Sequence, residues 1–251
     1  MRATAGVSVL GLIVAWSLVD SGSHAQTAPP PGFVSIFNGE DLTGWKIPEG
    51  DNGHWKVVDG VIDYDAGSEA EDDKNLWTVK SYGNFEAKVD WRIKATPYVS
   101  ENMRIVMPDG HNKKDEKGEE IRLTAPDSDS GFILRGSGKA QLNIWCWPVG
   151  SGEMYGYRTA KDTAPALRAA VTPALNADND IGEWNTFEVT VVDKTVTVQL
   201  NGKLIIDKAT LPDLPAEGPL GLQHHGGVGK DGEYTGIPAL VQFRNIFVKE
   251  L

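Results

Sequence analysis

Cysteine is nearly absent from this chain, which has one cysteine in 251 residues. A single cysteine forms no disulfide within the chain, and it excludes the cysteine clusters that hold structural zinc. Basic residues are also outnumbered, because 24 lysines and arginines stand against 35 acids and give a formal net charge of −11 at pH 7. We therefore expect no nucleic-acid partner, since binding the phosphate backbone requires a clustered basic surface.

Long apolar runs are absent beyond the N-terminus. Residues 7–19 form an apolar stretch after Arg2, and the small-x-small pattern Ser23-His24-Ala25 follows it. This order predicts a secretory signal peptide over residues 1–25. The alternative is an uncleaved anchor, although the run is shorter than the roughly 20 residues that a span needs. We expect a mature chain without a membrane span, exported to the periplasm or the extracellular space.

Helix signals are scarce, whereas short strands and turns recur. A proline-rich lead-in occupies residues 26–32, and residues 84–94 then alternate apolar and charged side chains, as a half-buried strand does. Residues 55–65 and 186–207 carry apolar runs separated by Asp-Gly, Asp-Lys and Asn-Gly turn pairs. A short helix over 164–171 and a charged loop over 111–120 are the exceptions. The pattern predicts one domain over residues 33–251, an all-β, two-layer antiparallel sandwich.

One predicted strand carries polar and aromatic side chains on the face opposite its apolar residues. Leu142, Ile144 and Cys146 share one face, and Gln141, Asn143 and Trp145 share the other. Amides hydrogen-bond hydroxyl groups and an indole ring stacks on a sugar, so this face suits a carbohydrate. The alternative is an ordinary solvent-facing strand. Cys146 is expected to be buried and structural.

A histidine pair follows another apolar run. By alternation from Leu220 and Leu222, Gln223 and His225 point outward, while His224 falls on the core side or at the strand end. Histidine suits proton transfer near neutral pH, and it also binds metals. The alternative is a histidine that is hydrogen-bonded for structural reasons.

Further candidate residues lie in two glycine-rich segments. Arg135 precedes a Gly turn and could hold a substrate oxygen or form an ion pair. Residues 150–158 concentrate Glu153, Tyr155 and Arg158 in a loop of the kind that borders binding clefts. Asp127 and Asp129 could cap a turn or bind Ca²⁺, but their spacing lacks a full calcium-loop pattern.

An ordered set of segments resembles a known family. The segments are FVSIFNGEDLTGWK (33–46), SGFILRG (130–136), GEWNTFEVTV (182–191), VTVQLNGKLIID (196–207), GPLGLQHHG (218–226) and VQFRNIFVKEL (241–251). They resemble the 3-keto-disaccharide hydrolase family, formerly DUF1080, whose members are described as 3-keto-glucoside 1,2-lyases with 3-keto-2-hydroxyglucal hydratase activity. The resemblance implies a jelly-roll sandwich of the concanavalin A-like lectin/glucanase type. At Gln141, however, many members carry a carboxylate, and residues 97–129 look like an insertion that covers the cleft.

The resemblance implies a sugar substrate, a 3-keto glycoside, and a set of roles. His225 would be the base that removes the C2 proton, Arg135 would stabilise the enolate, with or without a divalent metal ion, and Glu153 would be the leaving-group acid. The expected sugar-binding residues are Gln141, Asn143, Trp145, Gln223, His224, Tyr155 and Arg158. One alternative is a secreted lectin-like module without catalysis, which Gln141 favours. Another is a Ca²⁺-dependent glucanase, which would need two facing carboxylates. The oligomeric state is not predicted.

Overall fold

The computed structural model describes residues 26–251, and the predicted leader over residues 1–25 lies outside the described residues. Export therefore stays a prediction. Within residues 26–251 no helix is long and apolar enough to cross a bilayer.

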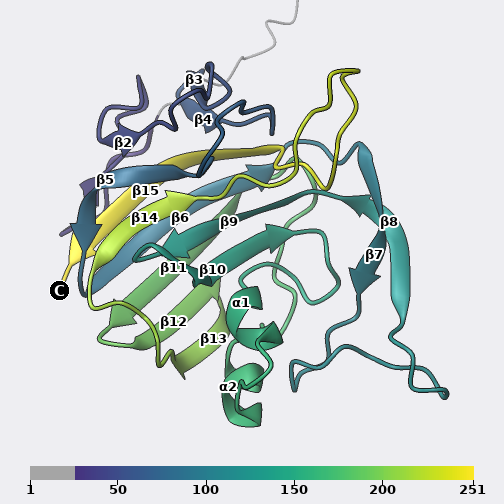
Figure 1. The fold of residues 1–251 in the computed structure, drawn as a ribbon. Helices are drawn as coiled ribbons and strands as arrows, with labels where there is room; N and C mark the ends of the chain where they lie inside the picture. The colour runs from purple at the N-terminus through teal and green to yellow at the C-terminus, as the bar shows by residue number, and fades with distance from the viewer. Residues whose placement is uncertain (1–25) are drawn as a thin grey trace, which may run out of the picture.

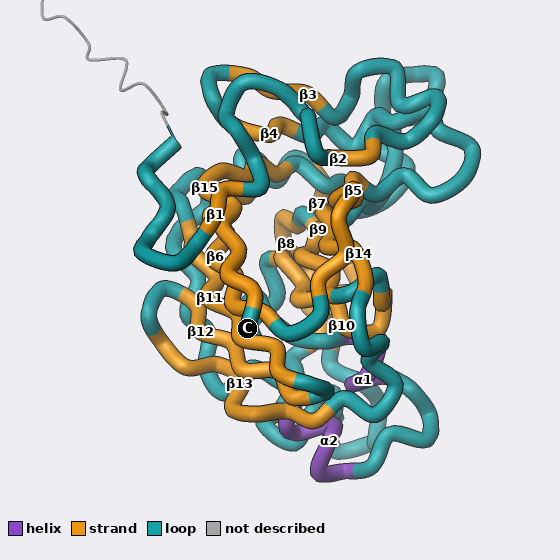
Figure 2. Tube along the Cα trace, turned by 90° about the vertical axis from the view of Figure 1, so that its left-hand side faces the viewer, coloured by secondary structure: helices purple, strands orange, loops and turns teal. Residues whose placement is uncertain are grey.

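Two antiparallel sheets form the body of the molecule, and Figure 2 shows them as two layers. The larger sheet contains, in spatial order, β13 (Lys203–Thr210), β12 (Thr195–Leu200), β11 (Asn185–Val192), β6 (Phe85–Ile93), β15 (Val241–Glu250), β4 (Val61–Asp63) and β3 (Lys56–Val58), with β1 (Val34–Ser35) also paired to β15. The smaller sheet contains β10 (Ser137–Trp145), β9 (Asp129–Leu134), β14 (Gly218–Leu222), β5 (Leu76–Tyr82) and β2 (Trp45–Lys46). The predicted all-β, two-layer antiparallel sandwich is confirmed.

The core lies between these two sheets because each central strand buries alternate residues. In β6 the apolar residues are buried and the charged residues between them are half-buried, as the alternation of residues 84–94 predicted. Phe187 and Val189 on β11 join the same core, and Phe132 and Leu142 reach it from the smaller sheet. Burying a side chain of this size contributes about 1.5–3 kcal/mol, so the pattern fixes which face of each strand points inward.

The predicted hairpins end in the expected turns. Asp59 and Gly60, which join β3 to β4, both have positive φ, and so do Asn201 and Gly202 between β12 and β13. A two-residue type I′ turn requires positive φ at both positions, which explains the Asp-Gly and Asn-Gly pairs.

A separate two-stranded sheet and two short helices complete the fold. Strands β7 (Tyr98–Arg104) and β8 (Arg122–Asp127) form a separate two-stranded sheet, and β8 leads into β9 (Figure 1). Helix α2 (Pro165–Ala170) lies within the predicted range 164–171, whereas α1 (Tyr155–Thr159) was not expected. Figure 1 shows α1 beside β10, and α2 packs against α1 and against β13 of the larger sheet. The site described next lies where β10, α1 and the β7–β8 sheet meet.

Candidate active site

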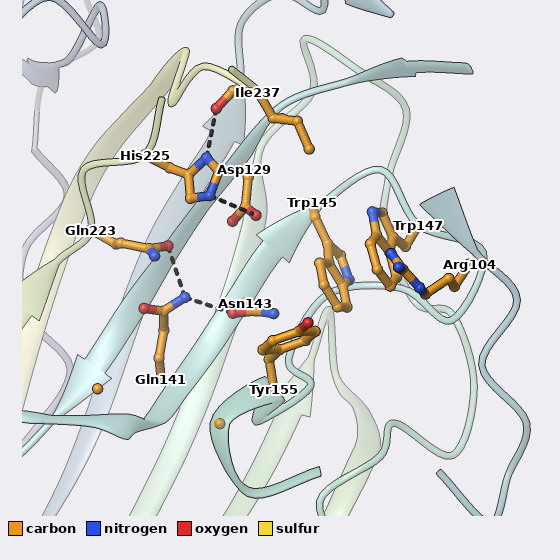
Figure 3. A pocket seen from close by; sticks show the side chains of 12 residues that line it. Arg104, Asp129, Gln141, Asn143, Trp145, Trp147, Tyr155, Gln223, His225 and Ile237 are labelled. Carbon is orange, nitrogen blue, oxygen red and sulfur yellow. Dashed lines mark hydrogen bonds and ion pairs between the residues drawn. The ribbon is translucent and has the colours of Figure 1, made fainter. Parts of the chain in front are cut away.

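A pocket of about 320 Å³ lies on the face of the smaller sheet that points away from the core. Strands β9 and β10, the segment after β14, and residues near α1 contribute its walls (Figure 3). The residues that line it are Arg104, Asp129, Gly138, Gln141, Asn143, Trp145, Trp147, Tyr155, Gly156, Gln223, His225 and Ile237. Alternation along β10 explains why Gln141, Asn143 and Trp145 face the pocket, because Leu142 and Ile144 between them point into the core.

Three amide side chains form a connected floor at one end of the pocket (Figure 3). Gln141 Nε2 donates to Asn143 Oδ1 at 2.6 Å and to Gln223 Oε1 at 2.8 Å. Both accepting oxygens are therefore engaged, and the NH₂ groups of Asn143 and Gln223 remain as donors. The carbonyl oxygen of Gln141 remains as an acceptor. This floor suits a ligand that offers one carbonyl oxygen and several hydroxyl groups.

Gly131 makes this arrangement possible. It pairs with Asn143 across β9 and β10, and a Cβ atom at this position would lie 2.5 Å from Gln141 Cγ. Any side chain here would therefore displace Gln141 from the floor. This explains in physical terms why the SGFILRG segment carries glycine at its second position.

His225 and Asp129 face each other beside the amide floor (Figure 3). His225 Nδ1 bonds the Ile237 carbonyl at 2.7 Å, and its Nε2 lies 3.7 Å from Asp129 Oδ2. Because a carbonyl only accepts, Nδ1 carries the proton and Nε2 of the neutral ring has a free lone pair. Gly226 permits the close approach of the 237–238 segment, since its φ is +71° and a Cβ atom would lie 2.5 Å from the Ile237 oxygen.

Asp129 is held in an unusual environment for a carboxyl group. Burial raises the pKa of Asp129 to about 7, and the nearby His225 opposes that rise. Its Oδ1 atom is buried and accepts no hydrogen bond from any of residues 26–251. A carboxyl with such a pKa exchanges protons near neutral pH, as a general acid or base must.

The other end of the pocket is aromatic. The rings of Trp145 and Trp147 are stacked, with centroids 4.1 Å apart and planes 4° apart, and Tyr155 meets Trp145 edge-on at 6.2 Å. Arg104, from β7, places its guanidinium 5.9 Å from the Trp147 ring centroid. Two residues of the segment 97–129, Arg104 and Asp129, thus line the pocket, and the expectation that this segment covers the cleft stays a prediction.

The side chains of the pocket include few metal ligands. Among residues 26–251, no three His, Cys, Asp or Glu side chains gather in a way that would hold a metal ion. His225 and Asp129 are the two lining residues of these types. The donor set is mainly amide, and the chemistry proposed below uses protein groups alone.

Comparison with known families decides the identity of the domain. Residues 32–249 match the family described as the 3-keto-alpha-glucoside-1,2-lyase-like domain. The chain belongs to this family. A comparison with curated proteins gave no match.

Two solved structures share the fold of this lyase-like domain, and both are candidate glycosyl hydrolases from Parabacteroides distasonis. The first has 22% sequence identity and a TM-score of 0.53, with 88% of this chain and 94% of that chain covered. The second has 21% identity and a TM-score of 0.52, with 88% of this chain and 85% of that chain covered.

The lyase-like domain brings together six of the residues that the sequence singled out. Those that line the pocket are Gln141, Asn143, Trp145, Tyr155, Gln223 and His225. Alternation along the strands was sufficient to group most of them. Cys146 directly follows β10 and is only partly buried, which corrects the expectation that it is buried; burial raises the pKa of its thiol to about 12.

Arg135 lies outside the pocket, and its expected place in the site is corrected. It occupies the turn that follows β9, about 20 Å along the strand from Asp129 at 3.3 Å per residue. Its guanidinium is buried and donates to the carbonyl oxygens of Gly83, Asp193 and Pro215. Arg135 therefore joins three loops rather than a substrate oxygen.

Glu153 and Arg158 also lie outside the pocket. Arg158 Nε donates to Glu153 Oε1, and both side chains are almost completely buried. Burial raises the pKa of Glu153 to about 7, and the positive charge of Arg158 opposes that rise. As placed, Glu153 does not reach a leaving group and Arg158 does not reach a sugar. Arg158 instead lines a separate groove with Asn112 and Arg168.

His224 points away from the pocket, which corrects its expected role in sugar binding. Its Nδ1 bonds the Tyr64 hydroxyl, and its backbone N–H donates to Asn75 Oδ1 at 2.8 Å. Burial, together with the positive charge of Lys74, lowers the pKa of His224 to about 4. His224 thus anchors the turn that presents His225.

Three of the charged or aromatic side chains in the pocket, Asp129, Trp147 and Arg104, are not predicted from the sequence as pocket residues. Asp129 was considered only as a turn cap or a Ca²⁺ ligand, although it shares a strand face with Gly131 and so with the amide floor. Trp147 lies just beyond the end of β10, and Arg104 comes from the separate β7–β8 sheet, so no strand pattern linked either to the site.

Proposed function

We propose that this protein cleaves 3-keto glycosides by removing the C2 proton, expelling the group at C1 and hydrating the product. The observation that carries the proposal is the pairing of His225 Nε2 with Asp129, beside an amide floor, within a lyase-like domain. A ketone at C3 acidifies the C2–H bond, so a base with a near-neutral pKa is sufficient for the first step.

His225 is the proposed base. Its Nδ1–H donates to the Ile237 carbonyl, which orients the ring and leaves the Nε2 lone pair to accept the C2 proton. Asp129, 3.7 Å from Nε2, then faces a protonated imidazole and can take part in returning that proton. General acid–base catalysis of this kind contributes about 10²–10⁴-fold to a rate.

The amide floor supplies the proposed enolate stabiliser. When the C2–H bond breaks, its electron pair delocalises onto the C3 oxygen, which becomes negative. The NH₂ groups of Asn143 and Gln223 remain as donors for this oxygen, because Gln141 engages only their carbonyl oxygens. Preorganised donors aimed at a developing oxyanion contribute about 10²–10³-fold each.

The remaining steps balance as an elimination and an addition. The C1–O1 bond breaks, its electron pair leaves on O1, and a C1=C2 double bond conjugated with the C3 ketone forms. Water then adds to C1 and a proton returns to C2, so that the net reaction is hydrolysis. A paired-carboxylate glycosidase would need two facing acids. Asp129 is the only carboxyl among the described residues that line this pocket.

The test is ¹H NMR of the protein mixed with a 3-keto glucoside in D₂O. We expect deuterium to enter C2 and the aglycone to be released. His225→Ala and His225→Gln should slow the deuteration of C2 and the release of the aglycone by about a hundredfold or more, because they remove the base. A parallel sample with EDTA shows whether a metal ion contributes. Full turnover in both His225 variants would rule out the assignment of the base.

The matched control is His111→Ala, because His111 is exposed in the 111–120 loop and does not line the pocket. It should retain wild-type turnover. Tight binding of an unmodified glycan without any deuteration of a 3-keto glucoside would instead support the lectin-like alternative. The three amides and Trp145 are the features that would serve such binding.

A further inference from the structure

The pocket has two chemically distinct ends, and only one of them is assigned above. His225, Asp129 and the amide floor occupy the polar end, whereas Trp145, Trp147 and Tyr155 occupy the other (Figure 3). A glycoside bound with its C2 at His225 must place the group on C1 in the remaining space. The aromatic end therefore bears on which leaving groups the protein accepts.

The aromatic end offers ring surface and few hydrogen-bond donors. Trp145 Nε1 donates to the Gly150 carbonyl at 2.8 Å, and Trp147 Nε1 donates to Asp127 Oδ2 at 3.2 Å. Both indole N–H groups are thus used within the protein. The two indoles are nearly buried and form a wall, whereas Tyr155 is 44% exposed and presents the ring that a ligand can reach. Arg104, which also lines this end, donates through Nε to Glu120 Oε2 and through Nη1 to the Asn102 carbonyl. A second sugar would therefore find mainly the Tyr155 hydroxyl and the remaining N–H groups of Arg104 as partners.

The aromatic end also has no carboxylic acid among the described residues that line the pocket. Asp129, the single carboxyl, faces His225 at the polar end, and the Glu153 carboxyl is covered and paired with Arg158. An alkoxide leaving group needs such an acid to protonate it. A phenolate is a far weaker base and departs without one.

We propose that the aromatic end binds an aryl aglycone, so that the preferred substrates are aryl 3-keto-glucosides. This inference rests on the proposed function. After His225 removes the C2 proton, the C1–O1 bond breaks, and its electron pair leaves with the aryl oxygen as a phenolate that solvent later protonates. Tyr155 stacks on the aryl ring, and Trp145 and Trp147 form the wall beside it.

The first test compares 3-keto-glucosides of 4-nitrophenol, phenol and methanol with a 3-keto-disaccharide, in both anomers. We expect kcat/KM for the phenyl compound to exceed that for the methyl compound and the disaccharide by about tenfold or more, since aromatic contacts contribute at this scale. The nitrophenyl compound should be faster again. A higher kcat/KM for the disaccharide, or rates independent of the leaving group, would overturn the inference.

The same spectra separate this inference from the proposed function. Deuteration of C2 reports proton removal, whatever leaves from C1. If all four compounds are deuterated at C2 but kcat/KM is highest for the disaccharide, only the aryl preference is contradicted. No deuteration of any compound would sink the proposed function, and the inference with it.

Variants of Tyr155 test the stacking contact. Tyr155→Ala should lower kcat/KM for the phenyl compound about tenfold more than for the methyl compound, mainly through KM. Tyr155→Phe keeps the ring and should retain the aryl preference. If Tyr155→Phe lowered kcat/KM for the phenyl compound as much as Tyr155→Ala does, the hydroxyl group rather than the ring would make the contact, and stacking would be rejected. Tyr98→Ala is the control, since Tyr98 lies on β7 and does not line the pocket.

Discussion

Asp129 shows how a single carboxyl with one buried oxygen changes the chemistry of a sheet face. It begins β9, where its backbone N–H donates to the Pro238 carbonyl at 3.3 Å, and its side chain faces His225. Gln141 occupies the position where a carboxylate is expected from the resemblance to the family. Asp129 is thus the group in the pocket that carries an exchangeable proton beside His225.

We predict that Asp129→Asn lowers kcat by about a hundredfold, because the variant keeps the shape of the side chain and removes its proton exchange. Burial raises the pKa of Asp129 to about 7, so the wild-type pH–rate profile should bend near pH 7, and this bend should be absent from the variant. Stopped-assay kinetics between pH 5 and 9 measure kcat and the pH–rate profile of the wild type and the variant. Asp207→Asn, at an exposed position of β13, is the control. An unchanged profile in the Asp129 variant would remove the carboxyl from the mechanism.

Arg135 is a residue whose burial implies a structural role. It is 1% exposed, and its guanidinium donates to three backbone carbonyls and to Asn84 Oδ1. Charged hydrogen bonds contribute about 1.5–3 kcal/mol each, and an unpaired buried acceptor is costly.

We predict that Arg135→Met lowers the free energy of unfolding by about 3 kcal/mol, because it leaves these carbonyl groups unpaired. Urea denaturation measures the change, and KM of the folded fraction should stay within about twofold because the residue does not line the pocket. Arg122→Met on β8, where the side chain is exposed, should have little effect on stability. Normal stability combined with lost turnover would restore Arg135 to the site.

Adjacent residues of β10 have different roles, because one stabilises the core and the next lines the pocket. Leu142 is buried in the core, and the next residue, Asn143, lines the pocket. We predict that Leu142→Ala lowers the free energy of unfolding by about 2–5 kcal/mol, as core truncations do. Asn143→Ala should instead slow turnover by about a hundredfold, by removing a donor for the enolate oxygen. Thermal unfolding and NMR turnover, measured on both variants, check this division, and a reversed pattern would contradict it.

At the scale of elements, the parts of the fold that follow from local pattern could be predicted. The alternation in β6 and β10, the turns at Asp59-Gly60 and Asn201-Gly202, and the outward direction of His225 depend on neighbours in sequence. The sequence misplaces Arg135, Glu153 and Arg158 because side chains in turns, loops and a five-residue helix follow no such periodicity. Their positions depend on carbonyls and charges that are 5 to 80 residues away in sequence.

On the scale of the whole molecule, the balance of buried acids governs the response to pH. Burial raises the pKa values of Asp127, Asp129, Glu153 and Asp178 above the usual range for carboxyl groups. The folded chain therefore holds protons that the unfolded chain releases as pH rises from about 4 to about 7. His224 opposes this, since burial lowers its pKa to about 4, so that it favours folding at higher pH. The pKa values of Asp41, Asp65 and Glu120 are lowered, but these groups affect stability only below about pH 4.5, where carboxyl groups titrate in the unfolded chain. Above that pH, four carboxyl groups with raised pKa values against one imidazole leave a net loss of stability as pH rises.

We predict that the protein is most stable near pH 4.5–5 and that its Tm falls by at least about 3 °C between pH 5 and pH 7.5. One pKa unit of net shift corresponds to about 1.4 kcal/mol, which moves Tm by roughly 3–6 °C in a domain of this size. The net charge of −11 at pH 7 adds self-repulsion in the same direction. Differential scanning calorimetry across this range measures the slope. The double variant Asp129→Asn, Glu153→Gln should flatten it, because neither side chain titrates any longer, whereas Asp207→Asn should leave it unchanged. A Tm that rises from pH 5 to pH 7.5 in the wild type would mean that the buried carboxyl groups are charged throughout, and Asp129 would then have no proton to exchange with His225.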